Sequence, residues 1–163
     1  MKGRGFSFIE LIVVLVLLSL SIALIAPSLS RFSKSVELKT AVKKVAAILR
    51  YSRSEAINKG KVYQVIFDSN LMVVKVQAVE PEDQEEQEKK EAKDTSKVYA
   101  LPSSIQMKEV KVESTQYPSD LPAIEFYPNG GSNGGDILLD TQSEKGYKIK
   151  VNFLTGTVII EKV

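Results

Sequence analysis

The chain begins with an apolar stretch from Phe6 to Ala26 that carries a single charged residue, Glu10. As a helix rising about 1.5 Å per residue, this stretch is roughly 30 Å long, which matches the hydrocarbon core of a bilayer. We therefore expect it to span a membrane once. Residues 1–5 carry Lys2 and Arg4, and the tendency of short basic segments to stay in the cytoplasm sends the remainder of the chain across the membrane.

A secretory signal peptide has the same order of a basic and then an apolar segment, and its cleavage site follows the apolar core. Ala23, Ala26 and Ser28 are small residues of the kind that such a site needs, although Pro27 lies among them. Cleavage near Ala26 would remove the whole stretch and leave an ordinary secreted domain, so the sequence keeps this alternative open.

Gly5 and Phe6 are followed by Ser7-Phe8-Ile9-Glu10-Leu11. This order resembles the cleavage and methylation motif of type IV prepilins and of the pseudopilins of type II secretion. The resemblance implies that a dedicated prepilin peptidase cuts after Gly5, that residues 1–5 are a leader, and that the new N-terminus at Phe6 is N-methylated. The apolar helix then stays on the mature protein.

The same resemblance implies a role for Glu10. A carboxylate inside a bilayer costs about 2.5–3.5 kcal/mol at the centre of a helix, so it usually has a partner or a function. Cleavage after Gly5 creates an α-amino group on Phe6, four residues before Glu10 and on the same face of a helix. In the family, pairing of this kind between subunits sets the register of filament assembly. Alternatively, Glu10 lies near the helix end and reaches the headgroups.

Composition excludes several kinds of chemistry. The chain has no Cys and no His, which excludes Ser-His and Cys-His nucleophilic catalysis and Cys/His zinc sites. It has 22 basic and 20 acidic residues, and the loss of Lys2 and Arg4 would make them equal. Overall charge therefore does not favour nucleic-acid binding. We expect no cofactor, no metal site and no enzymatic activity.

Helical periodicity resumes after Pro27, a residue that can kink or loosen a helix. Apolar residues recur at steps of three and four as far as Ile57, and Asn58-Lys59-Gly60 provides a glycine C-cap. We therefore predict an amphipathic helix over residues 27–60. Between Arg31 and Lys61 there are nine basic and two acidic residues. This basic face has three interpretations. It is an ordinary solvated surface, or it contacts acidic surfaces of neighbouring subunits. Nucleic-acid binding is the third, which the sequence favours least.

From Lys61 onward the period changes to two, which predicts strands, and the absence of a second long helix favours antiparallel pairing. Residues 61–163 should form an antiparallel β domain, in which Asp68-Ser69-Asn70 makes a hairpin turn. The predicted fold class of the whole chain is therefore α+β, with the long helix packed on antiparallel sheet. Residues 80–97 have eight acidic residues and four lysines and read as an exposed insertion, with docking on a basic helix face of another subunit as the alternative. The predicted strands are 62–67, 71–76, 98–101, 105–112, 123–127, 137–139, 147–153 and 157–161.

The glycine-rich stretch 129–136 does not have the spacing of a phosphate-binding loop, so we predict a turn between strands. Asp136 and Asp140 could bind a metal ion, but two aspartates on a loop are common. Phe126–Gly130, Asp136–Leu139 and Val151–Val158, together with the helix segment Leu49–Ala56, resemble the minor pseudopilin H family of type II secretion, which is shared with the FimT-type minor pilins (GspH/FimT). Thr157 stands where that family often has arginine.

This second resemblance implies a minor pseudopilin: a structural subunit of the pseudopilus that supports protein export across the outer membrane. It implies a single-pass protein of the inner membrane with its C-terminal domain in the periplasm. Its partners would be other pseudopilins, the prepilin peptidase/methyltransferase, the inner-membrane assembly platform and lipid. The alternatives are a minor pilin of a type IV pilus or DNA-uptake system, which could bind DNA, and an anchored domain that never polymerises.

Overall fold

The computed structural model describes residues 7–79, 96–141 and 144–163, without the side chains of residues 23–32, 144 and 145. The chain divides into two compact units, Met1–Val36 and Glu37–Val163. Gly5 and Phe6, which carry the predicted processing site, and residues 80–95 of the predicted acidic insertion lie outside the described residues.

One long helix, α1, runs from Phe8 to Lys59 and contributes to both units. Pro27 lies within its continuous helical backbone. The helix ends where predicted, because Gly60 has a φ of +65°, a left-handed conformation that glycine adopts without the penalty of a Cβ atom. Lys59 in the last turn also complements the negative end of the helix dipole.

The second half of α1 is amphipathic, as its sequence pattern predicts. Its buried residues recur at steps of three and four, while Lys39, Lys43 and Lys44 between them are exposed. This spacing places one apolar stripe against the rest of the second unit. The buried stripe consists of Leu38, Ala41, Val42, Val45, Ala46, Ile48, Leu49, Ser52 and Ala56.

The first sheet has the strand order β3-β2-β1-β5 and is antiparallel throughout. The hairpin of β1 and β2 begins its turn at Asp68, whose side-chain oxygen accepts hydrogen bonds from the backbone N–H groups of Asn70 and Leu71, both at 2.9 Å. This is the turn that the sequence predicts, and Asp68 is occupied in holding it. The strands are β1 Val62–Asp68, β2 Val73–Val79, β3 Lys97–Ala100 and β5 Ala123–Phe126.

The second sheet has the order β4-β6-β7-β8 and is also antiparallel. Its register shifts between Met107 and Glu109 in the pairing of β4 with β6, and between Leu139 and Thr141 in the pairing of β6 with β7. The strands are β4 Gln106–Lys111, β6 Gly135–Thr141, β7 Glu144–Val151 and β8 Val158–Lys162.

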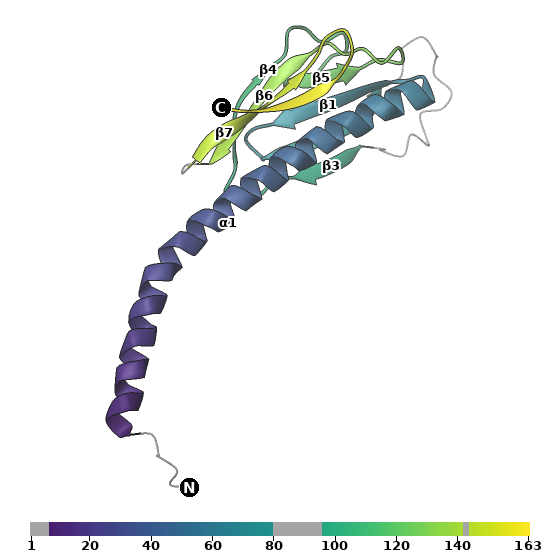
Figure 1. The fold of residues 1–163 in the computed structure, drawn as a ribbon. Helices are drawn as coiled ribbons and strands as arrows, with labels where there is room; N and C mark the ends of the chain where they lie inside the picture. The colour runs from purple at the N-terminus through teal and green to yellow at the C-terminus, as the bar shows by residue number, and fades with distance from the viewer. Residues whose placement is uncertain (1–6, 80–95, 142–143) are drawn as a thin grey trace. The chain divides into compact units, whose positions relative to one another are not determined.

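A single hydrophobic core joins the second half of α1 to both sheets. Figure 1 shows this part of the helix beside β1 and β3 of the first sheet. The fold class predicted from the sequence, a long helix packed on antiparallel sheet, is therefore confirmed. Fully buried members of the core include Leu38 and Leu49 of α1, Val65, Phe67 and Ile124 of the first sheet, and Ile137, Leu139 and Ile149 of the second.

Candidate functional site

Of the residues predicted to act in processing and assembly, the structure describes Glu10. It lies in the first turn of α1, and its side chain is exposed. At the start of the helix, the N–H of Leu11 donates to the C=O of Ser7 at 3.2 Å. A carboxylate in the first turn is favoured by the positive end of the helix dipole. Its pairing with an α-amino group stays a prediction.

The first unit exposes an unusual amount of apolar surface. All large apolar side chains between Phe8 and Ile22 are at least 40% exposed. Soluble monomers rarely expose contiguous apolar patches of this extent. This surface therefore calls for an apolar partner, whether lipid or protein. Within the part of the chain that the structure describes, no helix meets the length and hydropathy required of a membrane-spanning segment.

In the second unit, segments far apart in the sequence meet beside the C-terminal part of α1. Arg53 donates from Nε to the C=O of Gly130 at 3.0 Å, and Arg50 donates from Nη2 to the C=O of Val158 at 3.0 Å. The N–H of Ser132 donates to the C=O of Phe153, also at 3.0 Å. The helix end, the glycine-rich turn and the C-terminal strands, which share the family resemblance, are thus bonded to one another.

Gly156 lies where these segments approach most closely. Its φ is +60°, and a Cβ atom at this position would lie 2.6 Å from the carbonyl oxygen of Gly130 and 2.9 Å from Nε of Arg53. Backbone and guanidinium would both have to move to admit it. Glycine is therefore required here by conformation and by space.

The turn from β7 to β8 is fixed by its own side chains. Asn152 accepts hydrogen bonds at its side-chain oxygen from the N–H groups of Leu154 and Thr155, both at 3.0 Å. Phe153 and Leu154 at the tip are 58% and 79% exposed. The turn thus holds two large apolar side chains in solvent on a backbone with little freedom.

Glu125 on β5 is fully buried and is the centre of a polar network in the second unit. Its carboxylate accepts hydrogen bonds from the backbone N–H groups of Gln116 and Tyr117 at 2.9 and 3.0 Å, from the hydroxyl of Tyr127 at 3.0 Å and from Nε2 of Gln64 at 3.4 Å. A buried carboxylate needs partners of this kind, because desolvation otherwise disfavours the folded state. Glu125 therefore ties the segment between β4 and β5 to the first sheet.

Asn133 extends this network. Asn133, also buried, accepts a hydrogen bond at Oδ1 from the N–H of Glu125 at 2.8 Å and donates from Nδ2 to the carbonyls of Ser114 and Ala123 at 2.7 and 3.1 Å. Burial and the hydrogen bond to Glu125 raise the pKa of the Tyr127 hydroxyl well above its usual range. Tyr127 therefore stays protonated and donates.

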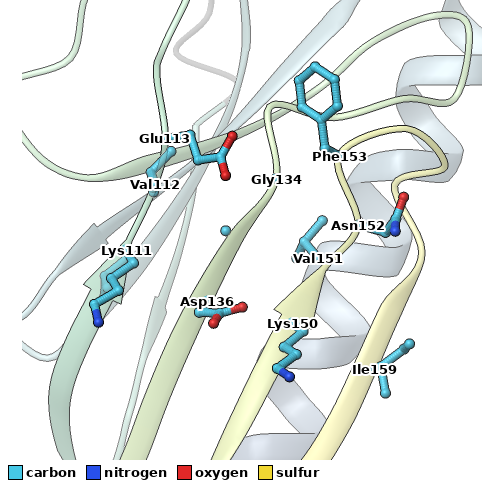
Figure 2. A pocket seen from close by; sticks show the side chains of 12 residues that line it. Lys111, Val112, Glu113, Gly134, Asp136, Lys150, Val151, Asn152, Phe153 and Ile159 are labelled. Atoms are coloured by element: carbon cyan, nitrogen blue, oxygen red, sulfur yellow. The ribbon is translucent and has the colours of Figure 1, made fainter.

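A groove of about 710 Å³ lies on the second sheet, where β4 and β7 end and β6 begins (Figure 2). Apolar groups such as Phe153 and Ile159 line it together with charged groups of both signs. Three of these charges are paired: Lys111 with Glu109 at 2.9 Å, Lys150 with Glu161 at 2.8 Å, and Asp136 with Lys148 at 3.8 Å. The groove therefore has no dominant charge and is suited to protein contact rather than to a highly charged ligand.

The sequence suggested Asp136 and Asp140 as possible metal ligands. Both lie on β6, and Asp140 pairs with Lys108 at 3.0 Å. Among the described residues, no group of three or more acidic side chains is placed to hold a metal ion. The network around Glu125 was not predicted, because its partners come from a segment without periodicity. A glutamate within the otherwise apolar strand Ala123–Phe126 was the signal that could have indicated it.

Comparison with known proteins agrees with this architecture. The family model of Type II transport protein GspH matches residues 41–155. The Type II secretion system protein H of Xanthomonas campestris pv. campestris is 27% identical over 155 residues, which cover 95% of this chain and 81% of that protein.

Two solved structures share the fold. The minor pseudopilin EpsH from the Type 2 Secretion System of Vibrio cholerae matches with a TM-score of 0.56 and 14% identity, covering 77% of this chain and 97% of that one. The type IV minor pilin FimU of Pseudomonas aeruginosa matches with a TM-score of 0.55 and 15% identity, covering 80% and 92%.

The long helix and two antiparallel sheets thus define a pilin-like protein, with the fold seen in pseudopilins and minor pilins. The family match covers more than half of the chain and includes the helix end, the first sheet, strands β4, β6 and β7 of the second sheet, and the glycine-rich turn that Arg53 binds. The chain belongs to the Type II transport protein GspH family, as its sequence motifs predicted.

Proposed function

We propose that the protein is a minor pseudopilin, a structural subunit of the type II secretion pseudopilus that supports protein export across the outer membrane. The observation that carries this proposal is the family match over residues 41–155. A minor pilin of a type IV pilus or DNA-uptake system is the second candidate, because FimU and EpsH match this fold almost equally well.

We further propose that a prepilin peptidase removes residues 1–5 by cleavage after Gly5, and that the new N-terminus at Phe6 is N-methylated. Phe6 to Ala26 then spans the inner membrane once, and residues 27–60 carry the helix into a periplasmic domain formed by residues 61–163. The exposure of the large apolar side chains between Phe8 and Ile22 supports this arrangement, because such a surface is stable in lipid and not in water.

Glu10 is the assembly residue in this proposal. Its exposed carboxylate in the first turn of α1 is open to another subunit, and the freed amino group of Phe6 supplies the opposite charge that an acidic group in lipid requires. The partners are other pseudopilins, the peptidase/methyltransferase, the inner-membrane assembly platform and lipid.

We expect the protein to have no catalytic activity of its own. The family is one of structural subunits, so peptide cleavage belongs to the peptidase and the force for export to a cytoplasmic ATPase. The buried carboxylate of Glu125, which an active site would leave accessible, is instead bonded to backbone N–H groups.

The proposal is tested by complementing a strain that lacks this protein with the natural chain, Glu10→Gln or Glu10→Asp. The readouts are the amount of secreted protein in the medium and the mass of the mature N-terminus. We expect a methylated Phe6 in all three. We expect secretion to fail with Glu10→Gln, which removes only the charge, and to persist in part with Glu10→Asp, which keeps it.

Each alternative has its own result. Full secretion with Glu10→Gln would indicate an anchored domain that does not polymerise. An N-terminus near Ala26 would indicate an ordinary secreted domain. Unchanged secretion in the deletion strain, together with loss of piliation or DNA uptake, would favour the second candidate.

A further inference from the structure

A hollow of about 290 Å³ lies in the second unit between the last turns of α1 and the first sheet. Its walls are formed by aromatic and charged side chains from α1, β1 and β3 and from the connection after the helix. We name it the tyrosine–lysine pocket. These side chains are Tyr51, Glu55, Lys59, Lys61, Tyr63 and Lys97.

The tyrosine–lysine pocket is positively charged. It has three lysines and one glutamate, which leaves two positive charges in excess. The Nζ atom of Lys59 lies 5.9 Å from the centre of the Tyr63 ring, and that of Lys97 lies 5.1 Å from the centre of the Tyr51 ring. Contacts of lysine with aromatic faces hold the ammonium groups in place.

Both ammonium groups stay charged under physiological conditions. The hydrogen bonds of Lys59 to Glu55 and Tyr63 raise the pKa of its ammonium group, and the hydrogen bond to Tyr51, at 3.4 Å, raises that of Lys97. The lysines are exposed, so an incoming anion reaches them without displacing the core.

The pocket continues onto the edge of the first sheet. Among the described strands, β3 lies at this edge and begins with Lys97, and its residue Val98 is 60% exposed. An edge strand presents unpaired backbone N–H and C=O groups to which an extended peptide can add. Ala78 of β2, which is partly exposed, provides apolar surface beside the lysines.

We propose that the tyrosine–lysine pocket binds the carboxylate side chains of an extended acidic peptide segment that is presented by another protein subunit and adds to the edge of β3. A peptide fits better than a nucleic acid, because a peptide backbone can pair with the edge of β3 and its side chains can contact Ala78. A sugar-phosphate backbone cannot add to a sheet. The proposal extends the assembly role, but the pocket and its test do not depend on that role.

The test is a titration of the full-length chain, held in a non-ionic detergent, with fluorescein-labelled hexaglutamate followed by fluorescence anisotropy at low salt. The double variant Lys59→Gln/Lys97→Gln should bind about fivefold or more weakly, since two exposed charge contacts are removed. The matched control Lys148→Gln/Lys150→Gln removes two lysines from the second sheet and should bind as the natural chain does. Equal thermal unfolding of both variants establishes that they are folded.

A second probe separates backbone addition from simple charge attraction. Hexaglutamate with alternate backbone nitrogens methylated has the same charge and cannot pair fully with β3, so it should bind more weakly than the unmodified peptide. Equal losses in the two double variants, or equal binding of the two peptides, would overturn the proposal.

Two other occupants give distinct results, and either would also overturn it. A hexathymidylate that binds more tightly than hexaglutamate, and that Lys59→Gln/Lys97→Gln releases, would identify a nucleic-acid site. Binding of hexaglutamate only after residues 80–95 are replaced by glycine and serine would identify the chain's own acidic segment as the occupant.

Discussion

Replacing the buried Glu125 by glutamine should destabilise the second unit strongly, although it changes only one oxygen to an amide nitrogen. One carboxylate oxygen accepts from the N–H of Gln116 and the hydroxyl of Tyr127, and the other accepts from the N–H of Tyr117 and Nε2 of Gln64. Whichever way the new amide turns, its NH₂ group faces two donors.

The smaller loss occurs when the amide NH₂ faces Tyr127, because that hydroxyl can rotate and accept. The N–H of Gln116, which points at the buried side chain of residue 125, is then left without an acceptor, which costs about 1–3 kcal/mol. The remaining hydrogen bonds lose their charge assistance, which adds about 1 kcal/mol. We therefore expect the free energy of unfolding to fall by about 2–4 kcal/mol, which corresponds to a decrease in Tm of roughly 10 °C for a domain of this size.

The measurement is urea unfolding of Glu37–Val163, the second compact unit, followed by circular dichroism. The matched control is Glu109→Gln, which removes an exposed carboxylate paired with Lys111 at 2.9 Å and should change the free energy of unfolding by less than about 0.5 kcal/mol. An unchanged or higher stability of Glu125→Gln would refute the reasoning, since it would mean that burying the charge costs more than its hydrogen bonds return.

Three further predictions concern the contacts around the helix end and the buried network. Gly156→Ala should lower the free energy of unfolding by more than about 2 kcal/mol, because the new Cβ atom would lie 2.6 Å from the carbonyl oxygen of Gly130. The control is Gly60→Ala, at a similar φ, where the new Cβ atom would have no neighbour within 4 Å. This control should lower the free energy of unfolding by only about 1 kcal/mol. Arg53→Met keeps the aliphatic stem but loses the hydrogen bond to Gly130, so chemical denaturation should show a loss of about 1–2 kcal/mol, and equal stability would show that the bond is dispensable. Burial and Glu125 raise the pKa of Tyr127 above the ordinary 10.0, so the stability that Tyr127 contributes is complete below pH 10 and is lost above it. Urea midpoints measured between pH 8 and 11 should therefore fall more steeply for the natural chain than for Tyr127→Phe. Parallel profiles of the two proteins would contradict this assignment.

The elements with a regular period could be predicted from the sequence. The strands Val62–Asp68 and Val73–Val79 follow an alternation that is visible within a few residues, and Gly60 marks the end of α1. Strand partners over long distances could not be predicted, because local pattern contains no information about them. The pairing of Tyr63 with Phe126 joins β1 to β5, and nothing in either strand specifies it.

The buried network escaped prediction for a related reason. All four residues of Ala123–Phe126 are buried, so this strand has lost the alternation that would place Glu125 on a solvent face. Its partners Gln116 and Tyr117 lie in a segment without regular secondary structure. By contrast, Arg53 lies in the helix segment Leu49–Ala56, which carries the family resemblance. Its hydrogen-bond partner, the carbonyl group of Gly130, could not be predicted.

The hydrogen bond between Arg50 and Val158 joins residues 108 positions apart, and this has a consequence for biogenesis. Val158 is also part of the core, so β8 completes the packing against the helix end. Contacts between residues so distant in sequence form late, since the intervening chain must be present first. The second unit therefore cannot finish folding until β8 has been synthesised, and by then the apolar helix at the start of this chain has already left the ribosome.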